Sequence, residues 1–168
     1  MKFYKFNQGH YTATIDTVNL IAYNNAPNVT INFPYAVQCD MIIQLKDTNK
    51  LGNAGIIFNY VDNKNFVVAE FFTNGTYQVW RSIKGTYSFV INSTYTTAVK
   101  KGGKTNTFKV IQNRTTAEII INNTSVRSFA LSLPSANCKS GPLAGTEVPI
   151  NYYTPLTVLF NNFILYKN

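Results

Sequence analysis

The sequence predicts an all-β fold, a sandwich or a barrel, formed by a single domain over residues 1–168. Three observations predict it: short stretches that alternate between apolar and polar residues, turn residues about every ten positions, and no sustained helical periodicity. The length of 168 residues fits one domain. Hydrophobic residues at 45% and aromatic residues at 14% supply enough apolar area for a core, which excludes intrinsic disorder.

The expected strands are rich in β-branched and aromatic residues. They cover residues 11–15, 20–23, 28–33, 36–46, 54–60, 66–72, 77–83, 87–91, 107–112, 117–122, 126–131 and 155–166. Turn-forming residues separate them, as at 62–65, 73–75 and 84–85. Residues 132–149 contain several prolines and glycines and are expected to form a long loop.

The alternation places polar side chains on one side of several strands. Gln78 and Trp80 share one face of the strand 77–83, Arg81 lies on the other, and Glu70 interrupts an apolar run. One sheet therefore carries amides, isolated charges and an aromatic residue on its outer side. This surface is either a hydrated sheet face or a shallow polar platform for a ligand.

The charge balance bears on partners. The chain has 15 Lys and Arg against 7 Asp and Glu, a net charge of +8 that favours anionic partners. Lys100, Lys101 and Lys104 flank two turn-forming glycines, which predicts either a solvated hairpin tip or a basic binding loop. No nucleic-acid-binding signature accompanies these lysines, so no nucleic-acid partner is predicted. No apolar run reaches 18 residues, so no membrane span is predicted.

The titratable residues do not suggest catalysis. No two of the carboxylates lie within three positions of each other, and the one histidine is His10. We predict no catalytic residue, no metal site and no cofactor. The two cysteines, Cys39 and Cys138, lack a metal-binding spacing, and a disulfide or two free thiols remain open.

Two features bear on location. The N-terminus has no apolar signal-peptide region, and six Asn-x-Ser/Thr sequons occur. An excess of sequons is typical of a secreted glycoprotein, so an extracellular or surface-exposed location is expected. The sequons begin at Asn28, Asn74, Asn92, Asn113, Asn122 and Asn123.

A series of short motifs runs through residues 53–168. A Gly-Ile-x-Phe hairpin over 53–66 leads to the strand 74–81, then to Lys-Gly and Asn-Thr-Phe-Lys-Val within 101–110. The segments 117–123 and 159–165 follow, with Asn123 in place of the usual glycine and Asn161 in place of the usual aspartate. Together they resemble concanavalin A-like lectin/glucanase domains and laminin-G-like domains, whereas residues 1–52 fit only by strand count.

The resemblance implies two antiparallel sheets stacked as a jelly roll, with glycans bound or cleaved on the concave face or at the rim loops. Cleavage in the glucanase branch needs a Glu-x-Asp-x-x-Glu strand, and no such series follows Glu70. Calcium sites in these families need clustered Asp and Asn. The turn 62–65 has one aspartate and includes Lys64, so no calcium is expected.

The leading hypothesis is a non-catalytic carbohydrate-binding or adhesion module. Amides pair with sugar hydroxyls and aromatic rings stack on the apolar face of a sugar. The predicted partner is a glycan or glycoprotein, and the net charge favours an anionic one. The candidate ligand-binding residues, with Glu70 and Asp40 as hydroxyl acceptors, are Asn59, Tyr60, Asn63, Glu70, Gln78, Trp80, Arg81 and Asp40.

Two alternatives stay open. The first is a structural surface, fibre or capsid subunit that self-associates through the jelly roll, because low charge and abundant Asn and Thr suit packing between copies. The second is a glycoside hydrolase or lyase, which needs two carboxylates roughly 5–9.5 Å apart. Asp40, Glu70 and Glu118 are the strand-borne candidates for such a pair.

Overall fold

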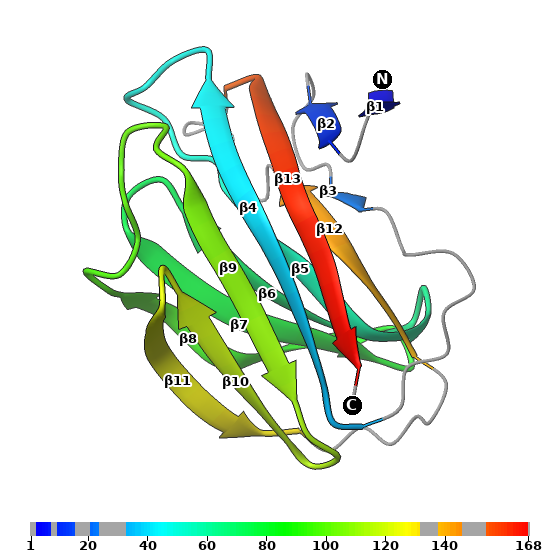
Figure 1. Ribbon diagram of the computed structural model, residues 1–168. Helices are drawn as coiled ribbons and strands as arrows, with labels where there is room; N and C mark the ends of the chain where they lie inside the picture. The colour runs from blue at the N-terminus through cyan, green and yellow to red at the C-terminus, as the bar shows by residue number, and fades with distance from the viewer. Residues whose placement is uncertain are drawn as a thin grey trace.

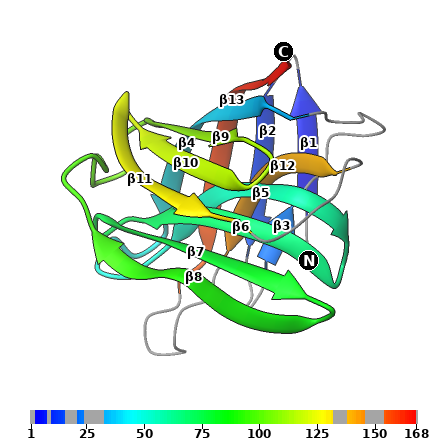
Figure 2. The same cartoon turned by 90° about the horizontal axis from the view of Figure 1, so that it is seen from below.

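The computed structural model describes residues 3–7, 10–15, 21–23, 33–131, 138–145 and 154–167, with backbone alone for 3–7, 10, 21–23 and 167. Two antiparallel sheets pack face to face, as Figures 1 and 2 show from two directions. Within these residues, no helix has the length and apolar character needed to cross a membrane.

The seven-stranded sheet has the order β1-β2-β13-β4-β9-β10-β11. Its strands are β1 (Phe3–Asn7), β2 (His10–Ile15), β4 (Tyr35–Leu45), β9 (Asn106–Gln112), β10 (Thr116–Ile121), β11 (Thr124–Ala130) and β13 (Leu156–Lys167). The six-stranded sheet has the order β3-β12-β5-β6-β7-β8. Its strands are β3 (Ile21–Tyr23), β5 (Asn53–Asp62), β6 (Asn65–Phe72), β7 (Thr76–Ile83), β8 (Thr86–Tyr95) and β12 (Lys139–Gly145).

The predicted all-β sandwich is confirmed, and most predicted strands are present with small shifts at their ends. The predicted strand 28–33 falls mainly on positions outside the described residues. The expectation of one long loop over 132–149 is wrong, because β12 pairs with both β5 and β3 inside it. Local preference disfavours a strand containing Gly141 and Pro142, so this strand depends on its two partners rather than on propensity.

The core lies between the sheets and follows the alternation along each strand. Val67, Ala69 and Phe71 of β6 point into it. Phe71 stacks on Phe108 of β9, with 5.6 Å between ring centroids, and so joins the two sheets. Both rings are essentially fully buried.

The predicted hairpin tip at residues 100–104 is instead part of the connection between β8 in one sheet and β9 in the other. The alternation could not show this, because the strands on either side are both regular and could equally have paired. The buried side chain of Asn106 holds the loop through hydrogen bonds with the backbone of Lys100 and Lys104. The lysines therefore lie at the end of the sandwich, not at the tip of one sheet.

The two cysteines are free, buried thiols, one of the two alternatives left open by the sequence. Cys39 belongs to β4 and points into the core. Burial, with a contribution from the neighbouring Asp40, raises the pKa of the Cys39 thiol to about 12. At neutral pH this thiol is therefore protonated and is a poor nucleophile.

Truncating the ring that joins the sheets tests this packing. We expect Phe71→Ala to lower the free energy of unfolding by about 3–5 kcal/mol, because it removes a buried ring and leaves a cavity. Phe89→Ala is the matched control: its ring is 60% exposed, so we expect a change within about 0.5 kcal/mol. Urea denaturation measures both, and equal effects would contradict the assignment of the core.

Candidate functional site

We call the face of the six-stranded sheet that points away from the core the outer face. It carries a second, smaller cluster of buried hydrophobic side chains. This cluster is formed by side chains of alternating positions on β12, β5, β6 and β7. The buried members are Ile57, Phe66, Val68, Trp80 and Leu143, with Tyr60 packed against them. The sheet is therefore apolar on both sides near its centre, and its outer face is not simply a hydrated surface.

A carboxylate lies in the middle of this outer face. Glu70 is 1% exposed and accepts three hydrogen bonds from neighbouring strands. Gln78 Nε2 donates to Oε1 at 2.6 Å, and Trp80 Nε1 donates to the same oxygen at 2.8 Å. Asn53 Nδ2 donates to Oε2 at 2.5 Å. Both oxygens are thus occupied by protein donors, and Glu70 does not reach the surface.

Two effects oppose each other at this carboxylate. Burial raises the pKa of Glu70, while the hydrogen bonds from Gln78, Asn53 and Trp80 lower it, and burial is the larger effect. The side-chain oxygen of Asn53 is buried without a hydrogen-bond partner. It can therefore accept a hydrogen bond if the amide turns over and a donor appears at Glu70 Oε2.

Aromatic rings extend from this network toward the edge of the sheet. Tyr60 stacks on Phe66 with 6.2 Å between ring centroids. Phe66 packs against Trp80 in a T-shaped arrangement with 5.5 Å between ring centroids. Trp80 in turn lies 5.7 Å from Tyr87. These four rings, the aromatic row, come from β5, β6, β7 and β8 in order. Phe66 and Trp80 in the middle of the row are buried, whereas Tyr87 at its end is 64% exposed.

A groove of about 220 Å³ opens at the exposed end of the row and is lined by Gln78, Trp80, Tyr87, Ser88 and Phe89. Phe89 lies opposite Trp80 in the pairing of β7 with β8 and is 60% exposed. The groove combines two exposed rings with an amide whose nitrogen is already bound to Glu70. We call it the aromatic groove.

The structure brings together three of the residues predicted from the sequence: Glu70, Gln78 and Trp80. Of these, Gln78 and Trp80 line the aromatic groove, whereas Glu70 holds both of them from the buried side. Tyr60 and Asn63 lie at the other end of the row, where the Tyr60 hydroxyl donates to Asn63 Oδ1 at 2.7 Å.

The other three predicted residues lie elsewhere. Arg81 alternates to the opposite side of β7 from Trp80, and its Nε donates to Ser88 at 3.3 Å. Asn59 is buried in a left-handed conformation with φ of 50°, and its backbone N–H donates to the hydroxyl of Tyr35. Asp40 belongs to β4 in the other sheet and accepts hydrogen bonds from Thr107 and Asn162.

Sequence reasoning did not select Asn53, Phe66, Tyr87 or Phe89. A signal for the last two is present in the two-residue turn Lys84-Gly85, which has φ of 52° and 83°. Two positive φ values are typical of the type I′ turn, which fixes hairpin register. Counting outward from that turn pairs Ser82 with Tyr87 and Trp80 with Phe89, as the structure does.

The described residues include no group of three or more His, Cys, Asp or Glu side chains that could hold a metal ion. At the turn 62–65, the Asp62 carboxylate is bound to its own loop. It accepts from the backbone N–H of Lys64 at 2.7 Å and from Asn65 Nδ2 at 2.9 Å. These hydrogen bonds lower the pKa of Asp62, and the one from the Lys64 backbone has the largest effect.

Comparisons with known proteins bear on the fold. No protein-family model and no curated protein sequence matches the chain. Carbohydrate binding module CBM66 from Bacillus subtilis is similar in structure, with 15% identity and a TM-score of 0.69 over 99% of this chain and 92% of that one. Sheep galectin-11 is 12% identical, with a TM-score of 0.62 over 89% of this chain and 98% of that one.

A GH43 protein from Bacillus licheniformis is also similar, at 9% identity and a TM-score of 0.61. The match covers 96% of this chain and 34% of that one. At these identities the likenesses concern the fold. They confirm the predicted fold, a concanavalin A-like two-sheet jelly-roll sandwich, which this chain shares with a carbohydrate binding module and a galectin.

Replacing the buried carboxylate tests the network. In Glu70→Gln, the amide oxygen still accepts from Gln78 and Trp80, and the amide nitrogen can donate to Asn53 Oδ1. We therefore expect a folded protein. Glu70→Ala leaves buried donors unpaired and opens a cavity, so we expect a loss of about 3 kcal/mol in the free energy of unfolding.

The Glu70→Gln variant also tests the raised pKa of Glu70. Because the folded protein holds the Glu70 proton more tightly, the stabilisation from that proton is present below the ordinary value of 4.5 and is lost as pH rises through the raised pKa. The free energy of unfolding of Glu70→Gln minus that of the wild type should thus increase with pH above 4.5. Urea denaturation from pH 4 to pH 8 measures it, and a falling difference would contradict the assigned shift.

Proposed function

We propose that this chain is a carbohydrate-binding module that binds a glycan in the aromatic groove without cleaving it. The single observation that carries the proposal is the exposure of Tyr87 and Phe89 beside Trp80 and Gln78. Large exposed aromatic residues grouped around a polar side chain are uncommon on a surface that has no ligand.

The chemistry of the groove suits a sugar ring. Rings such as Tyr87 and Phe89 stack on the apolar C–H face of a sugar, and an amide pairs with its hydroxyls. Gln78 Nε2 donates to Glu70, which fixes the amide and leaves its oxygen to accept from a ligand hydroxyl. Glu70 thereby acts as a positioning residue, not as a direct ligand of the sugar.

The structural neighbours support the same class of ligand. One is by name a carbohydrate binding module and another is a galectin. The six Asn-x-Ser/Thr sequons support an extracellular or surface-exposed setting for this module. Not every sequon suits glycosylation in that setting, because Asn122 Nδ2 already donates to the carbonyl of Ala98 at 2.8 Å and to Asn106 at 2.8 Å.

The positions of the carboxylates support binding rather than hydrolysis. A glycosidase needs two carboxyl groups about 5–9.5 Å apart on either side of the scissile bond. In the six-stranded sheet, the oxygens of Glu70 face protein donors, and the Asp62 carboxylate at the end of β5 is bound by its own turn. Asp40 and Glu118 belong to the other sheet.

Removing the exposed rings tests the function. We expect Tyr87→Ala/Phe89→Ala to weaken binding of a recognised neutral glycan by about thirtyfold, since two stacked rings contribute about 2 kcal/mol together. Tyr95→Ala is the matched control, because it removes a ring that is 60% exposed on the same strand but lies outside the aromatic groove. The affinity of this variant for the glycan should equal that of the wild type. A glycan array identifies the ligand, and calorimetry measures the three affinities.

Two outcomes would overturn the proposal in different ways. No binding across a broad array, together with a discrete large assembly on size exclusion, would favour the structural subunit. Turnover of a glycan that is lost in Glu70→Gln would make the protein a hydrolase.

A further inference from the structure

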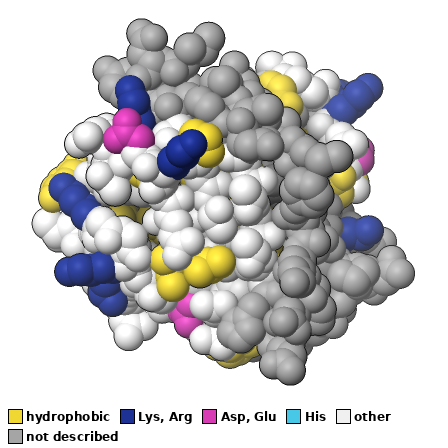
Figure 3. All heavy atoms as spheres, turned by 90° about the horizontal axis from the view of Figure 1, so that it is seen from above, with side chains coloured by type: hydrophobic (Ala, Val, Ile, Leu, Met, Phe, Trp, Pro, Cys, Tyr) yellow, Lys and Arg dark blue, Asp and Glu magenta, His cyan; other side chains and the backbone are white. Residues whose placement is uncertain are grey.

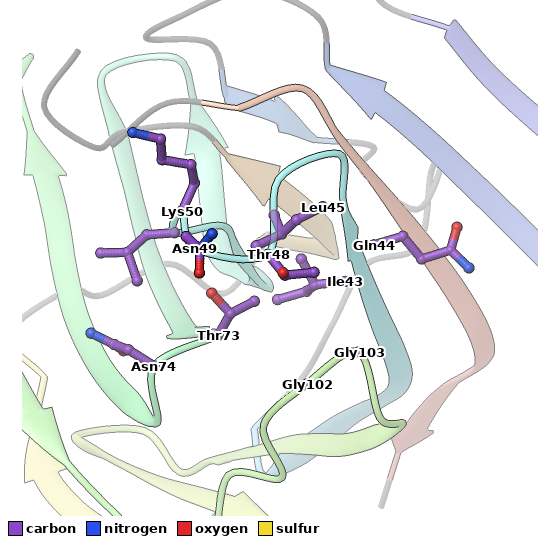
Figure 4. Close-up of a pocket in the computed structure, with 11 residues that line it drawn as sticks. Ile43, Gln44, Leu45, Thr48, Asn49, Lys50, Thr73, Asn74, Gly102 and Gly103 are labelled. Carbon is purple, nitrogen blue, oxygen red and sulfur yellow. The ribbon is translucent and has the colours of Figure 1, made fainter. Parts of the chain in front are cut away.

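A second hollow lies at one end of the sandwich, apart from the aromatic groove, and we call it the rim pocket. Its volume is about 480 Å³, and it shares no lining residue with the groove. Three segments form it: the end of β4 with the loop that follows, the β6–β7 turn at Thr73 and Asn74, and the loop 100–104 (Figure 4). This volume is within the range of sites that hold small ligands.

The lining changes in character from floor to mouth. Ile43, Leu45 and Leu51 provide apolar surface, and Ile43 is almost completely buried. Hydroxyl and amide side chains and one ammonium group surround it: Thr48, Asn49, Lys50, Thr73 and Asn74. In Figure 4, Gly102 and Gly103 form the wall opposite Thr48 and Asn49, while Gln44 points away. A ligand that matches this lining has an apolar face and several hydroxyl groups.

The basic wall of the pocket is held in place. Asn106 is 2% exposed, and its Oδ1 accepts the backbone N–H of Lys100 at 2.8 Å. Its Nδ2 donates to the carbonyls of Lys100 at 2.9 Å and Lys104 at 3.1 Å. One buried amide thus fixes both ends of the loop, and the positive φ of Gly102 and Gly103 allows the bend between them. A wall fixed before binding loses little conformational entropy when a ligand arrives.

Basic side chains outnumber acidic ones around the pocket. Lys50 lines it, and Lys100, Lys101 and Lys104 belong to its wall loop. The carboxylate of Asp47, in the facing loop, accepts the backbone N–H of Asn49 at 3.0 Å. Figure 3 shows this end of the molecule, with Lys and Arg side chains gathered along its left side and few acidic ones.

We propose that the rim pocket is a second saccharide site, one that takes an acidic sugar residue, with Lys50 and the lysines of the loop 100–104 attracting its carboxylate or sulfate group. The apolar floor and the amides suit the sugar ring, and the lysines add attraction for its charge. A simple polyanion, by contrast, would be attracted by the lysines alone and would not depend on the lining of the rim pocket. The proposal concerns a site separate from the aromatic groove and does not require the groove to bind.

The experiment uses the full chain and two matched saccharides, an oligogalacturonate and its methyl ester, which keeps the sugar but removes the charge. We expect the acid to bind at least about tenfold more tightly than the ester, measured by calorimetry. Lys100→Gln/Lys104→Gln should weaken binding of the acid by about tenfold. Lys64→Gln/Lys84→Gln removes the same charge from exposed turns elsewhere and should change affinity less than about twofold.

A second variant separates the pocket from the charge. Thr48 is exposed at the mouth, so Thr48→Trp fills the pocket and leaves all lysines in place. We expect it to abolish binding of the acidic saccharide, with thermal unfolding showing that the variant is folded. The proposal is overturned if neither oligogalacturonate nor a heparin oligosaccharide binds. It is also overturned if Thr48→Trp binds normally and inorganic polyphosphate competes equally, which would show a nonspecific basic surface.

Discussion

The arrangement of the outer face depends on one buried carboxylate. A carboxylate removed from water is strongly destabilising unless hydrogen-bond donors surround it. Glu70 receives such donors from the strand before it, through Asn53, and from the strand after it, through Gln78 and Trp80. Three neighbouring strands are thereby fixed in one register, because a slip of one residue would turn Glu70 into the apolar core.

The exposed part of the site follows from this constraint. The hydrogen bond to Glu70 fixes the indole of Trp80, and Phe66 supports that ring from the side. Tyr87 then rests on Trp80 at the edge of the sheet. A binding surface built on buried, immobilised rings loses little entropy when a ligand binds. The polar network is thus a means of positioning aromatic surface, and this explains a charged residue within an apolar run.

Much of this could be predicted from the sequence, for a clear reason. Alternation along each strand gave the sheet positions and showed Gln78 and Trp80 on one face. It could not say which strands are neighbours, so Asp40 and Glu70 were grouped although they belong to different sheets. The bulge at Asn59 also breaks simple alternation, and β12 forms only because its two partners are present.

The two hollows differ in chemistry, and the difference reflects their origin. The aromatic groove is built on regular strands and offers rings, whereas the rim pocket is built from connections and offers amides and lysines. Asn and Thr side chains line the rim pocket, whereas the polar groups of the aromatic groove come from Gln78 and Ser88. Both proposed sites thus use neutral polar groups, and the rim pocket adds Lys50 and the lysines of the loop 100–104.

The most direct test of the central claim uses the one tryptophan of the chain. Its indole N–H gives a single resonance in a nitrogen–proton correlation spectrum, recorded during titration with a neutral glycan that binds by calorimetry. We expect that resonance and the Gln78 side-chain amide to shift saturably, while the backbone amide of Thr107 on the other sheet stays fixed. Saturable binding that leaves the Trp80 indole unmoved would contradict the account.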